Sequence, residues 1–216
     1  AGRTVYLLGG LRAIPAGIGD ELESAGYSVV RYSGPDRFAT AVAVANALGD
    51  PSTVLLATGT GFPDALAAGP AAAHVHGAVL LTDGTALPAA TADYLSLHKP
   101  TVYAIGGAAV AADPTATAIV GADRFATAAA VASTFFAAPT QLGFAIGSAF
   151  PDALSGGAQL ALAGAPLLLV DGPGVPGSTD AYIAAHSSVT GGYLYGGTAI
   201  LSDTVMSELD TAISRP

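Results

Sequence analysis

Hydrophobic residues along the chain gather in short stretches of two kinds, and the two kinds alternate. One kind is alanine-rich and has helical length, whereas the other is short and apolar at nearly every position. In chain order these stretches are residues 36–48, 53–58, 64–75, 78–82, 88–97 and 101–105. Strands that are apolar throughout are typical of parallel sheets covered by helices on both faces. The pattern predicts an α/β protein of three-layer α/β/α units with mainly parallel, Rossmann-like sheets.

The alternation repeats, because three motifs occur twice in the same order. These motifs are G-x-D-R-F-A-T-A at 34–41 and 121–128, F-P-D-A-L at 62–66 and 150–154, and L-L-x-D-G at 80–84 and 168–172. An apolar strand ending in Gly-Gly occurs three times, so the chain starts and ends inside a repeat. We therefore predict pseudo-symmetric tandem units at 34–120 and 121–216. Residues 1–33 are expected to form a partial repeat, the strand-helix-strand tail of a preceding unit.

Composition excludes several functional classes. The formal net charge is −9, which repels nucleic acid phosphates and anionic lipid. The chain has no cysteine, so disulfides and thiolate catalysis are excluded. The uncharged stretch 153–170 contains several glycines and a proline, which favours a buried helix and strand over a membrane span. Because no basic and apolar leader precedes the first strand, we expect a cytosolic protein, a mature secreted one or an excised fragment.

The F-P-D-A-L motif places a carboxylate, Asp64 or Asp152, after a proline that suits the first helical position. A carboxylate there complements the helix dipole, which alone would justify its presence. Arg37 and Arg124 are expected either to pair with Asp64 and Asp152 as structural ion pairs or to face a ligand. An arginine held by one carboxylate still has donors for an anionic ligand, so both roles can coexist.

The G-x-D-R-F-A-T-A motif is expected to begin a helix. Asp36 and Asp123 fall in its predicted first turn, and Ser33 would cap the helix in the first copy only. Glycines follow the strands at the carboxyl edge of each predicted sheet, where open α/β sheets bind ligands. Their amides face an anion in one interpretation and merely permit a tight turn in the other.

Other chemical signals do not recur in the second copy. His74 and His76 have the spacing of metal ligands, but their counterparts are a leucine and a glycine, so no metal site is predicted. The glycines at 59 and 61 resemble part of a dinucleotide fingerprint that the second copy lacks. We therefore expect no cofactor. Tyr94 and His98 recur as Tyr182 and His186 and are predicted to pack together.

The ordered motif set resembles the cell wall-binding repeat 2 family, found in tandem in surface proteins of Gram-positive bacteria. The resemblance spans essentially the whole chain. It implies a non-catalytic anchor that holds a secreted protein on an anionic wall polymer, either teichoic-acid-like or another secondary polysaccharide. It also implies three repeats in a pseudo-trimer, with arginines and aspartates near the grooves between units.

By this resemblance, Arg37 and Arg124 are expected to contact the ligand first, with Asp64 and Asp152 orienting them. The whole candidate set comprises Arg37, Arg124, Asp36, Asp123, Asp64, Asp152, Thr40 and Thr127. The expected location is the cell wall or cell surface. One alternative function is a structural subunit of a surface layer (S-layer) or filament, with repeats associating between chains into a trimer-like arrangement. A second alternative is an enzyme on a Rossmann-like scaffold, although no nucleophile, base or cofactor motif occurs in both copies.

Overall fold

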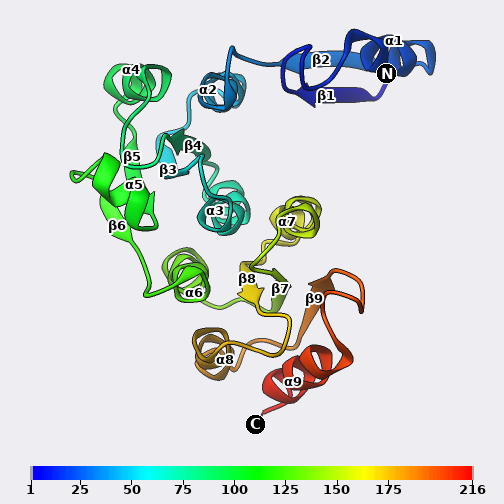
Figure 1. The fold of residues 1–216 in the computed structure, drawn as a ribbon, viewed down its shortest axis with the longest axis vertical. Coiled ribbons are helices and arrows are strands. Elements are labelled where there is room, and N and C mark those ends of the chain that lie inside the picture. The colour runs from blue at the N-terminus through cyan, green and yellow to red at the C-terminus, as the bar shows by residue number, and fades with distance from the viewer. Residues whose placement is uncertain (1, 216) are drawn as a thin grey trace.

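A computed structural model describes residues 2–215, in which helices and parallel strands alternate (Figure 1). The strands are β1 (Thr4–Leu8), β2 (Ser28–Tyr32), β3 (Thr53–Thr58), β4 (Ala78–Thr82), β5 (Thr101–Ile105), β6 (Thr117–Ile119), β7 (Gln141–Ile146), β8 (Leu167–Val170) and β9 (Gly191–Tyr195). The helices are α1 (Ala16–Ser24), α2 (Arg37–Ala47), α3 (Pro63–His74), α4 (Ala89–His98), α5 (Gly107–Ala112), α6 (Arg124–Phe135), α7 (Pro151–Ala163), α8 (Gly177–Ala184) and α9 (Asp203–Ile213).

The strands form three separate parallel sheets. Their orders are β1-β2, β4-β3-β5-β6 and β8-β7-β9, and every pairing is parallel. The middle sheet is the most complete, with β6 registered on β5 so that Ile119 lies opposite Ile105. The predicted α/β class and parallel sheets are confirmed.

A layer of small-residue helices lies between the middle and the last sheet. Helices α6 and α7 both pack on α3, and together the three helices contact strands of both sheets (Figure 1). Buried alanines dominate α3, so its backbone approaches its neighbours closely. One hydrophobic cluster runs from Leu55 and Ile105 of the middle sheet through α3 and α6 to Leu169 of the last sheet. The two repeats therefore share a core.

The outer faces of these sheets are covered by the remaining helices. Helices α2, α4 and α5 pack on the middle sheet, and α8 and α9 lie over the last one. The predicted pairs are confirmed here, since the rings of Tyr94 and His98 lie 4.4 Å apart and those of Tyr182 and His186 lie 4.1 Å apart. In residues 2–215, no helix is long and apolar enough to cross a membrane.

The first 33 residues contribute the β1-α1-β2 segment, which projects from the rest of the molecule beside α2 (Figure 1). Its β1 is the counterpart of β5, since both precede a Gly-Gly pair. Leu8 at the end of β1 is 56% exposed, whereas its counterpart Ile105 is fully buried. The difference arises because β3 and α3 cover β5, whereas β1 pairs with β2 alone.

Candidate functional site

The aspartate of the G-x-D-R-F-A-T-A motif is a helix cap in both copies. The carboxylate of Asp36 accepts a 2.8 Å hydrogen bond from the Ala39 amide, and that of Asp123 accepts the same bond from Ala126. Both residues have extended backbone and precede the first helical residue. The prediction that they lie in the first turn was therefore wrong by one position. Ser33 does not cap the helix, because Asp36 is the capping residue and its carboxylate accepts from the Ala39 amide.

The glycine and threonine of the motif hold the turn before the helix. The amide of Gly34 donates to Thr40 Oγ1 at 3.0 Å, and that of Gly121 donates to Thr127 Oγ1 at the same distance. A Cβ on either glycine would collide with the first turn of the helix, where the backbone passes too close for a side chain. These contacts give both threonines a structural role, and their part in ligand binding stays a prediction.

The motif arginines reach a backbone carbonyl, and not the predicted carboxylate partners. The guanidinium of Arg37 donates to the Gly59 carbonyl at 2.6 Å, and that of Arg124 donates to the Gly147 carbonyl. Neither arginine has a carboxylate within 4.0 Å in the described part of the chain. The expected ion pairs of Arg37 with Asp64 and of Arg124 with Asp152 are therefore wrong. Each arginine ties the start of its helix to the end of the strand that follows.

Asp64 lies at the start of α3, in the first turn that Pro63 opens, as predicted. Its carboxylate packs against the Cα of Gly106, the first glycine after β5, leaving no room there for a Cβ. Gly106 also has a φ of 82°, a conformation that favours glycine. Burial raises the pKa of the Asp64 carboxyl, and the nearby charge of Arg124 opposes that rise.

Asp64 and Arg124 line one cavity although they belong to different copies of the repeat. This composite cavity has a volume of about 310 Å³ and opens at the carboxyl edge of the middle sheet. The first repeat contributes the end of β3, the start of α3 and the Gly-Gly pair, and the second contributes its Asp-Arg motif. Its lining comprises Thr58, Gly61, Pro63, Asp64, Gly106, Gly107, Val120, Gly121, Asp123, Arg124 and Thr127.

The topology explains this pairing across repeats. The strand that leads into the second Asp-Arg motif is β6, which pairs with β5 of the preceding unit. Because parallel strands end at the same edge of a sheet, the motif is delivered beside the end of β5 and the start of α3. The sequence marks this strand only by the short run of residues 117–119 before Gly121, and its pairing with β5 is seen in the structure alone.

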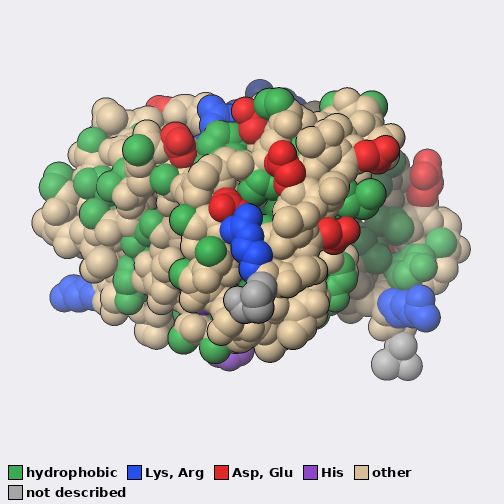
Figure 2. Space-filling view, turned by 90° about the horizontal axis from the view of Figure 1, so that it is seen from below, with side chains coloured by type: hydrophobic (Ala, Val, Ile, Leu, Met, Phe, Trp, Pro, Cys, Tyr) green, Lys and Arg blue, Asp and Glu red, His purple; other side chains and the backbone are tan. Residues whose placement is uncertain are grey.

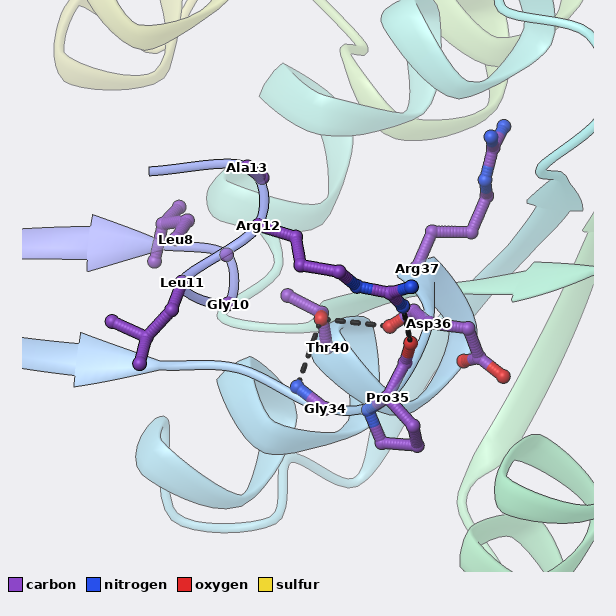
Figure 3. A pocket seen from close by; sticks show the side chains of 11 residues that line it. Leu8, Gly10, Leu11, Arg12, Ala13, Gly34, Pro35, Asp36, Arg37 and Thr40 are labelled. Carbon is purple, nitrogen blue, oxygen red and sulfur yellow. Dashed lines mark hydrogen bonds between the residues drawn. The ribbon is translucent and has the colours of Figure 1, made fainter. Parts of the chain in front are cut away.

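A second cavity forms where the first Asp-Arg motif meets the β1-α1-β2 segment (Figure 3). We call it the N-terminal cavity; its volume is about 620 Å³ and its lining includes Gly9, Gly10, Asp36, Arg37 and Thr40. Arg12 also lines it, and its guanidinium contacts the Pro35 carbonyl at 3.5 Å. Arg12 has no counterpart in the other copies, so the search for repeated residues missed it.

Asp152 in the last unit has a setting like that of Asp64 but without an arginine. Its carboxylate lies beside Gly196, which follows β9 as Gly106 follows β5. No Asp-Arg motif adjoins Asp152 in residues 2–215, because both motifs are at α2 and α6. The structure therefore brings Asp64, Asp123, Arg124 and Thr127 together, and Asp36, Arg37 and Thr40 together, while Asp152 stands apart.

The two cavities differ in charge. The composite cavity is lined by two aspartates, Asp64 and Asp123, and by Arg124, whereas the N-terminal cavity is lined by Asp36 and by two arginines, Arg12 and Arg37. The chain as a whole is acidic, with a formal net charge of −9, and the face in Figure 2 carries several separate aspartate and glutamate side chains. In residues 2–215, no group of three or more histidine, aspartate and glutamate side chains is arranged to hold a metal ion.

Comparison with known proteins places this architecture in a family. The profile of the cell wall binding domain 2 family matches residues 31–115 and 118–206, which together make up most of the chain. The chain belongs to this family. Each of the two matches begins shortly before an Asp-Arg motif. The resemblance based on the repeated motifs is confirmed, and cell wall binding and a location at the wall or cell surface follow for this module.

The known proteins that the chain resembles are much longer than it is. It is 25% identical over 219 residues to the N-acetylmuramoyl-L-alanine amidase LytC of Bacillus subtilis (strain 168), covering 98% of the chain and 44% of the amidase. Cwp6 from Clostridium difficile superposes with a TM-score of 0.87 at 21% identity, and Cwp8 with 0.82 at 22%. Each match covers 98% of the chain, but 36% of Cwp6 and 38% of Cwp8. The chain thus spans less than half of each relative.

Proposed function

We propose that this chain is a non-catalytic module that binds an anionic secondary polymer of the cell wall and so anchors a secreted protein at the cell surface. The observation that supports the anionic ligand is that two arginines, Arg12 and Arg37, are among the residues that line the N-terminal cavity. Guanidinium groups bind phosphates and carboxylates through paired hydrogen bonds. Both arginines have donors beyond those used in their contacts with carbonyl groups.

The overall charge of the module opposes a polyanion, so the attachment must combine several weak contacts. A net charge of −9 repels such a polymer at long range, and salt screens this repulsion. Two linked sites on one polymer raise the apparent affinity by about 100-fold or more, because the second contact forms at high effective concentration. The N-terminal and composite cavities supply two such sites in a single chain.

The test is sedimentation of the purified chain with isolated cell walls, before and after chemical extraction of their anionic polymers. We expect the chain to bind intact walls and to remain in solution with extracted ones. Equal binding to both preparations would overturn the anionic-polymer assignment.

A matched pair of arginine variants tests the cavity itself. The Arg12→Ala variant is expected to lower affinity for intact walls, because it removes a charge from the N-terminal cavity. The Arg3→Ala variant removes the same charge from an exposed position outside that cavity and is expected to bind as the unmodified chain does. Equal affinity of the two variants would contradict a role for this cavity.

The exposed apolar side chains of the β1-α1-β2 segment favour a second function, as a structural subunit whose repeats associate between chains. Tyr6, Leu8 and Leu11 are all more than half exposed. Neighbouring exposed apolar side chains of this size mark interaction surfaces. Light scattering during size-exclusion chromatography at high protein concentration separates the alternatives. Self-association is expected if the chain is such a subunit, and a monodisperse monomer would exclude it.

A further inference from the structure

The composite cavity holds a carboxylate that has no partner. In the described residues, no hydrogen bond to the Asp64 carboxylate is formed, although Asp64 is half-buried against Gly106 at the start of α3. A half-buried carboxylate without a donor is costly, since burial removes water that it would otherwise bind. The Asp64 carboxylate is therefore available to a hydrogen-bond donor from outside the chain.

The cavity also presents unused donors. Arg124 gives one guanidinium nitrogen to the Gly147 carbonyl, which leaves others without a partner in the described residues. Arg124 lies close enough to influence the charge of Asp64, but no nitrogen of it is within 4.0 Å of the Asp64 carboxylate. The two groups therefore line the same cavity without pairing with each other, and more than 4.0 Å separates them.

A ligand that fits this gap must donate to the carboxylate and accept from the guanidinium. A phosphodiester satisfies the guanidinium alone, because it has no proton to donate and its charge is repelled by Asp64 and Asp123. A pair of neighbouring hydroxyl groups satisfies both, since each hydroxyl can donate and accept. The glycines at 61, 106 and 107 keep the cavity wall free of side chains, which leaves space for a ring.

We propose that the composite cavity binds a neutral sugar residue of the wall polymer through a vicinal diol. One hydroxyl donates to the Asp64 carboxylate and its neighbour accepts from the Arg124 guanidinium. This inference rests on the proposed binding of a wall polymer. In this proposal the two cavities bind different parts of the polymer: the N-terminal cavity binds its charged groups, and the composite cavity binds a sugar ring.

Periodate treatment of isolated walls tests the proposal, because periodate cleaves vicinal diols and leaves phosphate groups in place. The full chain is sedimented with treated and untreated walls, and a phosphate assay confirms that the charge of the walls is unchanged. We expect treated walls to lose most of the binding. Undiminished binding to treated walls, with loss of binding to walls stripped of anionic polymer, would overturn the sugar site while leaving the proposed function standing. No binding to untreated walls would overturn both.

Matched carboxylate variants locate the site. The Asp64→Ala variant is expected to lower affinity for untreated walls by about tenfold or more, the range for loss of one hydrogen bond to a charged group. The Asp93→Ala variant removes an exposed carboxylate that lines neither cavity and is expected to bind as the unmodified chain does. Thermal melting of both variants checks that they fold. Equal losses of affinity, or none in either variant, would contradict the assignment.

Discussion

At the scale of single residues, Asp123 and Asp64 carry the same side chain and line the same cavity, yet their surroundings give them different tasks. The Asp123 carboxylate is occupied by the Ala126 amide at the start of α6. The Asp64 carboxylate rests against Gly106 with its hydrogen-bonding capacity unused. Asp123 therefore stabilises the fold. Asp64 does not, because burial disfavours its charged form, and its carboxylate is the one available to a ligand.

The capping role predicts the effect of two substitutions at one position. Asp123→Ala is expected to lower the free energy of unfolding by about 1 kcal/mol, because the Ala126 amide loses its acceptor. Asp123→Asn is expected to retain nearly all of that stability, since asparagine caps helices as well as aspartate does. Urea denaturation of the two variants measures the difference, and equal losses would show that charge and not capping is what matters there.

The unpaired carboxylate predicts a pH dependence of stability. The pKa of Asp64 is raised in the folded state above its ordinary value of 3.8, mainly by burial. The folded protein therefore holds this proton at pH values where the unfolded chain has lost it. The contribution of Asp64 to stability is most favourable at low pH and declines as pH rises from 3.8 through the raised folded value.

Asp64→Asn removes that decline. We expect the variant to gain stability relative to the unmodified chain as pH rises through this window, and to keep the gain at neutral pH. Unfolding free energies measured in urea from about pH 3 to about pH 7 test the sign. A variant that is less stable than the unmodified chain at neutral pH would mean that an attractive contact holds the carboxylate in the fold.

At this scale the sequence predicted which residues matter better than it predicted what they contact. The motif glycines, aspartates and arginines stood out because they recur. Their partners did not, because a guanidinium on a long flexible side chain can meet a carboxylate or a carbonyl equally well, and Gly59 and Gly147 offer carbonyls within reach. Arg12 could not be predicted from the repeated motifs, because the other copies have no arginine at the equivalent position.

At the scale of elements, close packing of small residues decides which helix positions are essential. Helix α7 lies on β7 with Leu160 directly over Gly143, where a Cβ would collide with that leucine. Leu162, two residues further on, points away from the core. The first leucine is fully buried and the second is 93% exposed.

This contrast provides a matched pair of substitutions within one helix. Leu160→Ala is expected to lower the unfolding free energy by about 2–5 kcal/mol, through lost burial and the cavity left over Gly143. Leu162→Ala removes the same atoms from the surface and is expected to change stability by less than about 0.5 kcal/mol. Chemical denaturation compares the two. Similar losses would show that α7 does not pack on β7 in this orientation.

Most helices and strands could be predicted from the sequence, because short stretches that are apolar throughout are typical of buried parallel strands and alternate with stretches of helical length. The short strand β6 was less evident, since residues 117–119 are a brief run with two exposed positions. Yet β6 fixes the composite cavity, because its pairing with β5 carries the second Asp-Arg motif to the first repeat. Assigning this strand to the preceding sheet requires the three-dimensional arrangement.

At the scale of the whole molecule, the repeats produce a site that neither contains alone. The shared helical layer of α3, α6 and α7 fixes the two units relative to each other, and the cavity forms at their junction. Asp64 of one unit and Arg124 of the next are far apart in the sequence but line the same cavity. The repetition predicted the parts of this site, and the packing of the units determines which parts meet.

A double-mutant cycle on wall affinity tests this composite site most directly. Affinity for isolated walls is measured for the unmodified chain, Asp64→Ala, Arg124→Ala and the double variant, with a parallel cycle that pairs Asp64→Ala with Arg37→Ala. Since Asp64 and Arg124 are proposed to hold one sugar residue, we expect their losses to fall well short of additive, whereas those of Asp64 and Arg37 should add. Additive losses for Asp64 and Arg124 would contradict a single site shared between the two repeats.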